Sequence, residues 1–207
     1  MPVDLLLATL ALGAALAVRP WRALGAGGPP WPWLAWWAAL PLLWSADRLA
    51  AVPLAPPLSG ACLLMLMTGW PLAVLAFVPV SVLAALLGEL GAAEALHRAV
   101  WLGIVPATFA MALGAAIRRW LPNHLFVYIL GRGFFATALA GTAAGGLATL
   151  VRPLPGGLQL ADLLLARGLA AWGDAFIAGM MVAIFVAFRP QWLATYTDRL
   201  YLPTRRE

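Results

Sequence analysis

Two ionisable residues, Arg132 and Asp174, lie inside long apolar runs of this 207-residue chain. A charge within a membrane-spanning segment is costly unless it faces a cavity or a partner, so a functional role is the first hypothesis for both. At 1.5 Å per residue, Arg132 would lie about 12 Å from one end of its helix and Asp174 about 10 Å from the opposite end of its own. The spacing predicts a buried Arg132–Asp174 pair that contacts a solute or joins two helices. The alternative is that Arg132 extends to the membrane surface and Asp174 contacts Arg167.

Three sulfur-containing side chains, Cys62, Met65 and Met67, form a candidate metal site. Soft sulfur ligands suit copper(I), and residues three apart, such as Cys62 and Met65, share a helical face. Because methionine commonly fills gaps in apolar cores, packing is the competing interpretation.

Catalytic motifs are missing from the sequence. A Ser-His-Asp set, an HExxH motif and a Gly-rich phosphate loop are all absent. A weakly held divalent ion has one candidate site, formed by Glu89, Glu94 and His97, although such groups are common by chance. We therefore predict that the chain is not an enzyme and that any ATP hydrolysis belongs to another chain.

The composition is that of a membrane protein. Hydrophobic residues make up 64% of the chain and charged residues 10%, whereas soluble domains have roughly 45–50% apolar and about 25% charged residues. Backbone polar groups must be bonded internally in hydrocarbon, and long Leu, Ala and Val runs without alternation favour helices over a barrel. We predict an all-α, polytopic transmembrane helical bundle.

A span needs about 20 apolar residues, or fewer when it is buried among others. Residues 58–87 are too long for one span and are interrupted by Gly69, Trp70 and Pro71, so a helix break is predicted there. This division gives about seven spans in a single transmembrane domain, residues 1–188, followed by a short cytoplasmic tail, 189–207. The predicted spans are 3–18, 31–44, 58–68, 71–87, 99–117, 125–150 and 168–188.

The distribution of arginine predicts the orientation, because cytoplasmic loops are enriched in basic residues. With the N-terminus outside, eight arginines fall in inner segments and three in outer segments. The inner ones are Arg19, Arg22, Arg118, Arg119, Arg189, Arg199, Arg205 and Arg206; the outer ones are Arg48, Arg98 and Arg152. We predict an N-out, C-in protein of a bacterial cytoplasmic membrane, and no binding of nucleic acid.

Small residues recur at four-residue spacing in the sixth predicted span, at Gly133, Thr137, Gly141 and Gly145. Such a stripe lets a second helix approach closely. Helix packing is therefore the predicted role of these four residues.

Three stretches together resemble a known family: 58–72 (LSGACLLMLMTGWPL), 121–135 (LPNHLFVYILGRGFF) and 172–192 (WGDAFIAGMMVAIFVAFRPQW). They are similar to energy-coupling-factor ABC transporter permeases of the CbiM-like group, the membrane components of cobalt and nickel uptake systems. The resemblance implies seven spans, capture of a small solute or transition-metal ion as substrate, and partners comprising membrane lipid, other membrane subunits and an ATPase module.

The chain departs from the family at the metal ligands. Members bind metal through an N-terminal Met-His site and histidines before the Leu-x-Gly stretch, whereas this chain begins Met1-Pro2 and has Pro56-Pro57 before Leu58. The sequence does not identify a cofactor, and a transition metal stays a candidate substrate without the usual histidine ligands. The alternative function is a structural or assembly subunit of a larger membrane complex that keeps the fold without transporting.

Overall fold

The computed structural model describes residues 1–23, 31–49, 56–151 and 159–201, and every regular element in these residues is helical. The all-α prediction is confirmed for this part of the chain. The helices are α1 (Pro2–Ala17), α2 (Trp31–Leu49), α3 (Ala61–Thr68), α4 (Trp70–Leu87), α5 (Ala92–Arg98), α6 (Val105–Trp120), α7 (Ala136–Val151), α8 (Leu160–Phe188) and α9 (Asp198–Tyr201).

Four helices are long and apolar enough to cross a membrane: Trp70–Leu87, Ala92–Trp120, Val127–Val151 and Leu160–Phe188. The second of them joins α5 to α6 through a π-helical stretch, Ala99–Ile104, and the third joins a π-helical stretch, Val127–Phe135, to α7. Large apolar side chains lie on the outside of these helices, among them Leu86 at 73% and Leu150 at 77% exposure. An apolar exterior of this kind is what a lipid environment stabilises.

The boundaries of the predicted spans need correction in two places. The span predicted at 99–117 is part of a helix that starts at Ala92, so Glu94, His97 and Arg98 are helical residues rather than parts of an outer loop. The span predicted at 168–188 begins eight residues earlier, at Leu160. The helix break lies where the sequence indicates: α3 ends at Thr68 and α4 begins at Trp70, with Gly69 between them at φ +82°.

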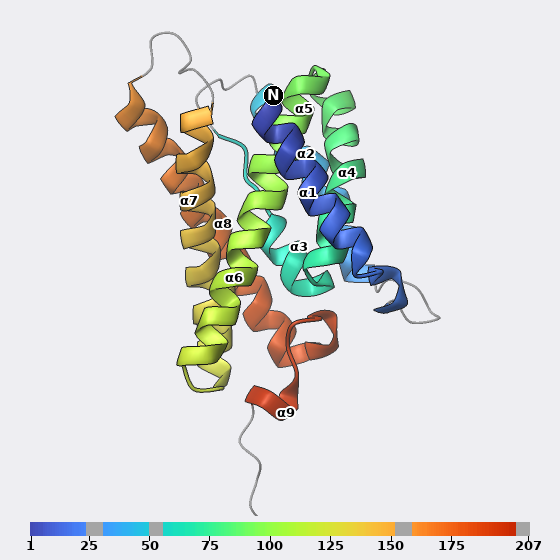
Figure 1. The fold of residues 1–207 in the computed structure, drawn as a ribbon. Helices are drawn as coiled ribbons and strands as arrows, with labels where there is room; N and C mark the ends of the chain where they lie inside the picture. The colour runs from blue at the N-terminus through green and yellow to red at the C-terminus, as the bar shows by residue number, and fades with distance from the viewer. Residues whose placement is uncertain (24–30, 50–55, 152–158, 202–207) are drawn as a thin grey trace, which may run out of the picture.

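The short helix α3 lies in the centre of the bundle (Figure 1). It contacts α2, α4, α6 and α8, and all of its residues from Ala61 to Met67 are at most 3% exposed. In Figure 1 α1, α2, α4 and α5 lie on one side of it and α6, α7 and α8 on the other. The N-terminus and α9 lie at opposite ends of the molecule, here called the N-terminal end and the α9 end.

The predicted stripe of small residues faces α8. A Cβ atom added at Gly133 would lie 3.2 Å from Val182, one at Gly141 would lie 2.9 Å from the Cβ of Ala171, and one at Gly145 would lie 3.2 Å from Arg167. Thr137 is 3% exposed and donates its hydroxyl to the carbonyl of Gly133. The stripe therefore brings α7 and α8 closer than larger side chains would allow.

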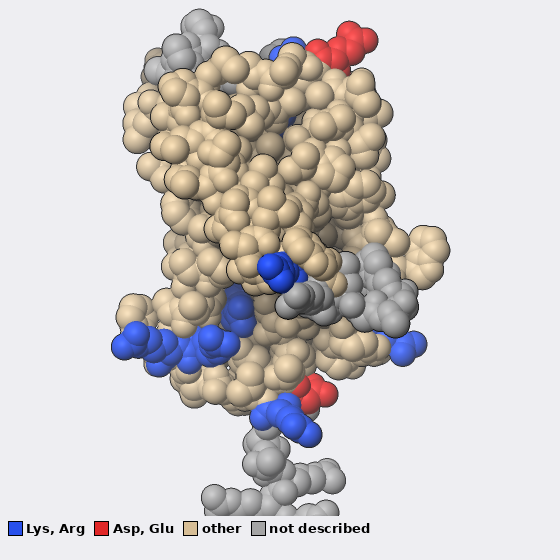
Figure 2. All heavy atoms as spheres, turned by 45° about the vertical axis from the view of Figure 1, so that its right-hand side comes forward, with Lys and Arg blue, Asp and Glu red and all other residues tan. Residues whose placement is uncertain are grey.

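Charged side chains on the face shown in Figure 2 gather toward the two ends, with an uncharged band between them. Exposed arginines of the described residues at the α9 end include Arg118, Arg119, Arg189 and Arg199. This distribution matches a protein whose middle faces hydrocarbon.

Candidate functional site: a polar cavity at the start of α3

A cavity of about 130 Å³ lies near the N-terminal end of the bundle. Four segments line it: the stretch before α3, the joined α5–α6 helix, α7 and α8. Its wall carries five ionisable side chains in an otherwise mainly apolar surface: Glu94, His97, Arg98, Arg167 and Asp174. A concave site with a few polar groups in apolar walls is the usual form of a small-molecule site.

Asp174 joins this cavity to the start of α3. Its Oδ2 accepts hydrogen bonds from the backbone N–H groups of Ser59, at 2.8 Å, and Gly60, at 3.0 Å. The first N–H groups of a helix have no partner within the helix, and the positive end of the helix dipole favours an anion there. Asp174 therefore acts as a cap supplied by a distant helix, α8.

The other polar groups at the start of α3 are also satisfied. Trp44 Nε1 donates to the carbonyl of Ser59 at 2.7 Å, and Trp36 Nε1 donates to the carbonyl of Gly60 at 2.9 Å. Gly60 is at φ +62°, and an added Cβ would lie 2.6 Å from Leu40. Only glycine fits this position, so the turn into α3 is closely specified.

One oxygen of Asp174 is left for a solute. The backbone N–H groups of Ser59 and Gly60 both donate to Oδ2, and Oδ1 accepts no hydrogen bond from the described residues. The side chain lines the cavity. The cavity thus presents a carboxylate oxygen that can accept a hydrogen bond from a donor or cationic group.

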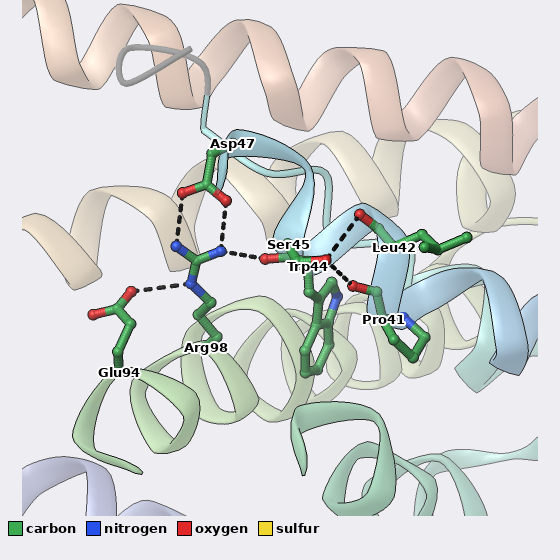
Figure 3. Close-up of polar contacts among 7 residues, drawn as sticks. All are labelled: Pro41, Leu42, Trp44, Ser45, Asp47, Glu94 and Arg98. Atoms are coloured by element: carbon green, nitrogen blue, oxygen red, sulfur yellow. Dashed lines mark hydrogen bonds and ion pairs between the residues drawn. The ribbon is translucent and has the colours of Figure 1, made fainter. Parts of the chain in front are cut away.

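The guanidinium of Arg98, which lines the cavity, is held by the carboxylates of Asp47 and Glu94 (Figure 3). Nη1 and Nη2 each lie 2.7 Å from an oxygen of Asp47, Nε lies 3.0 Å from Glu94, and Nη1 also donates to the carbonyl of Trp44. Arg98 is 7% exposed. A bidentate pair in which all three guanidinium nitrogens donate to an acceptor is a geometry that compensates the burial of the charge.

Sequence reasoning missed this network because it placed Arg98 in an outer loop. The i, i+4 spacing of Glu94 and Arg98 was the available signal, since such a pair favours a helix through both residues. Asp47, on α2, has no comparable signal because its partner lies 51 residues away.

A second polar cluster surrounds Asp4, which is fully buried. Its Oδ1 accepts a hydrogen bond from Trp101 Nε1 at 2.8 Å and lies 3.1 Å from His97 Nδ1. His97 is 7% exposed, Glu94 contacts Arg98, and the candidate ion site of His97 with Glu89 and Glu94 is not formed in the described part of the chain.

The predicted Arg132–Asp174 pair is also wrong. Arg132 Nη1 donates to the carbonyl of Thr195 at 3.3 Å and to the hydroxyl of Tyr201 at 3.4 Å, near the α9 end. Asp174 instead bonds to the start of α3, toward the N-terminal end of the molecule. The alternative contact with Arg167 is not formed either: Arg167 Nη1 donates to the carbonyl of Gly145 at 2.6 Å, although both side chains line the cavity.

The three sulfur-containing residues lie on α3, in the core of the bundle. Cys62, Met65 and Met67 are 3%, 1% and 0% exposed, and Cys62 Sγ lies 3.7 Å from the carbonyl of Pro106. Among the described residues, no group of three or more His, Cys, Asp or Glu side chains is placed to hold a metal ion. The copper(I) site stays a prediction, and packing accounts for the observed burial of all three residues.

The sequence matches no protein-family model, and no curated protein or solved structure shows a significant match to it.

Proposed function

We propose that this chain is the solute-binding membrane component of a transporter of the energy-coupling-factor type, with ATP hydrolysis on separate subunits. The observation that carries the proposal is the polar cavity beside a discontinuous helix: the free oxygen of Asp174 lines a cavity where α3 begins, and α3 breaks from α4 eight residues later. Transporters often place their sites at such interrupted helices. The resemblance in the stretches 58–72, 121–135 and 172–192 supports the same function.

The cavity supports a small solute with a hydrogen-bond donor or a cationic group. Its volume of about 130 Å³ is well below the roughly 300–1,000 Å³ of sites for drug-sized ligands. The guanidinium of Arg98 already donates to Asp47, Glu94 and the carbonyl of Trp44, so it is not available to an anionic solute, whereas Asp174 Oδ1 can accept from a donor. A transition-metal ion would need ligands from water or from the solute itself.

In the proposed topology the chain crosses a bacterial cytoplasmic membrane about seven times, counting α3 as a half-span, with its N-terminus outside. The exposed arginines at the α9 end support this orientation, because basic residues collect on the cytoplasmic side. The cavity then opens near the outer side, where a captured solute would enter. Lipid, further membrane subunits and an ATPase module are the proposed partners.

A thermal-shift screen on the purified full-length chain tests the solute site. The probes are Co²⁺, Ni²⁺, Cu⁺ and a panel of small amines and amino acids. A ligand present at about 100 times its Kd stabilises by roughly 2.7 kcal/mol, which raises the unfolding temperature of the natural chain. We expect at least one probe to do so, and Asp174→Asn to abolish the shift because the amide removes the free carboxylate.

The matched control is Asp162→Asn, which alters an exposed aspartate in the first turn of the same helix. It should keep the shift. A shift that survives in Asp174→Asn would remove this residue from the site. Absence of any shift, together with purification in a stable complex that lacks an ATPase, would favour the structural or assembly subunit instead.

A further inference from the structure

The chain following α8 turns back beneath the end of α3. The backbone N–H groups of Ala194 and Thr195 donate to the carbonyls of Met67 and Leu66, at 3.1 and 3.3 Å. The hydroxyl of Thr195 donates to the same Leu66 carbonyl at 3.1 Å. The last carbonyls of a helix have no partner within it, so residues 193–201, here called the C-terminal segment, cap α3.

Two side chains from the π-helical stretch Val127–Phe135 hold the C-terminal segment in place. The hydroxyl of Tyr128 lies 2.8 Å from that of Thr195, which completes a relay of donors from Tyr128 through Thr195 to the Leu66 carbonyl. Arg132 donates to the Thr195 carbonyl and the Tyr201 hydroxyl. Apart from the local bond of Leu193 to the carbonyl of Pro190, the polar anchors described for the segment lie on α3 or on this stretch.

Tyrosine rings complete the contact. The ring of Tyr128 lies 4.9 Å from those of Tyr196 and Tyr201, measured between centroids. Burial, with a further contribution from Asp198, raises the pKa of Tyr196 to about 12, so its phenol is neutral at physiological pH. Tyrosine side chains are favoured where the ring packs against apolar side chains and the hydroxyl contacts polar groups or water.

We propose that the C-terminal segment is a releasable latch that locks α3 from the α9 end. The attachment is short: its only regular helix is the four-residue α9, and three side chains, Leu193, Tyr196 and Tyr201, are buried. The other side chains are mostly exposed: Ala194, Thr197, Asp198, Arg199 and Leu200. Segments held by a few hydrogen bonds, with much of their surface in solvent, open at low free energy. Release leaves the carbonyls of Leu66 and Met67 uncapped and frees the end of α3 adjacent to the Gly69 break.

The latch has a direct consequence for the site. Asp174 holds the other end of α3, so α3 is fixed at one end by the cavity and at the other by the C-terminal segment. Any role of the latch as a gate on the cytoplasmic side rests on the proposed transport function, whereas the attachment of the segment to α3 does not. In a transporter, its release would let α3 move and connect the cavity to the cytoplasmic side.

The single cysteine of the chain, Cys62, lies within α3 at 3% exposure and serves as the reporter. The experiment measures the rate at which N-ethylmaleimide labels Cys62 in the purified full-length chain, followed by intact-mass spectrometry. Hydrogen exchange of the peptide spanning residues 193–201 is measured on the same samples.

The test variant is Thr195→Val, which keeps the side-chain shape but removes the hydroxyl between Tyr128 and Leu66. The control is Thr197→Val, the same change at an exposed position two residues on.

We expect Thr195→Val to raise both the labelling rate and the exchange rate about tenfold or more, since it removes two part-buried hydrogen bonds of the hydroxyl, and about 1.4 kcal/mol shifts an opening equilibrium tenfold. Thr197→Val should match the natural chain, and the global unfolding temperature should change little in either. Equal rates in the two threonine variants would overturn the latch, as would faster labelling that appears only together with global unfolding.

A second variant keeps the test decisive if Thr195→Val fails to insert. Tyr128→Phe removes the first donor of the relay without altering the C-terminal segment. It should accelerate exchange of residues 193–201, and exchange as slow as in the natural chain would overturn the proposal. Neither measurement depends on a solute, so failure of the latch and failure of the proposed transport function are told apart.

Discussion

Asp174 and Arg132 each have a separate reason to be charged inside an apolar bundle. Asp174 accepts two backbone N–H groups at the start of α3, where a negative charge is favoured. Arg132 donates to the C-terminal segment at the opposite end of the same helix. The two charges therefore have separate partners, and either can be altered without leaving the other as an unpaired partner.

Arg98 is the residue whose loss should cost the most stability. Replacing it by methionine removes the partner of Asp47 and Glu94, and breaking a buried pair from one side costs about 3 kcal/mol. For a chain of this length such a loss lowers the unfolding temperature by roughly 6–12 °C. Thermal unfolding of the purified variant measures the effect.

Arg48→Met is the matched control for that measurement. Arg48 lies on the same helix as Asp47 and is exposed; its charge and its backbone N–H both act on Asp47, but Asp47 forms its side-chain ion pair with Arg98. It should unfold within about 1–2 °C of the natural chain, because exposed charges contribute little. Equal losses in the two variants would show that the Arg98 network contributes no specific stability.

Among the elements, α3 is defined by the two glycines that bracket it. Gly60 and Gly69 both have positive φ, at +62° and +82°. Glycine adopts positive φ without strain, so these two residues permit sharp turns into and out of a helix of eight residues. An isolated helix of this length is unstable in water, so its stability comes from burial, from Asp174 and from the C-terminal segment.

The α7–α8 pair provides a test of close packing between elements. Gly141→Ala would place a Cβ 2.9 Å from that of Ala171, where both atoms are fixed by helical backbone. The helices must separate, and overpacking of this kind costs about 1–3 kcal/mol. We expect a lower unfolding temperature in thermal denaturation.

Gly146→Ala is the control on the same helix, because an added Cβ there meets nothing within 4 Å. Alanine should keep or raise stability, by up to about 1 kcal/mol, through its higher helix propensity. If both alanine variants were equally stable, the close approach of α7 and α8 would not depend on Gly141.

For the whole molecule, the distribution of charge predicts which end lies in the cytoplasm. With the C-terminus inside, a green fluorescent protein fused after Glu207 should fluoresce and an alkaline phosphatase fused there should be inactive. Fusions at the N-terminus should behave in the opposite way. An active phosphatase at the C-terminus would reverse the proposed orientation and place the polar cavity on the cytoplasmic side.

Composition and local pattern determined the features that depend on neighbouring residues. Long apolar runs required helices, because lipid cannot bond to backbone groups. The sequence Thr68-Gly69-Trp70-Pro71 located the helix break, because glycine and proline act on the backbone at their own positions. The four-residue spacing of Gly133, Thr137, Gly141 and Gly145 indicated a packing face for the same reason, although not the helix that would cover it.

Only the tertiary structure decided which polar groups meet. Depth along two helices placed Arg132 near Asp174, but depth says nothing about what lies between them, and α3 occupies that space. The hydrogen bonds that join Asp4, Asp47 and Asp174 to other helices or to the start of α3 span 51 to 115 residues along the chain. Contacts at such separations follow from how the helices pack, so the cavity and the capped half-helix emerge only once the bundle is assembled.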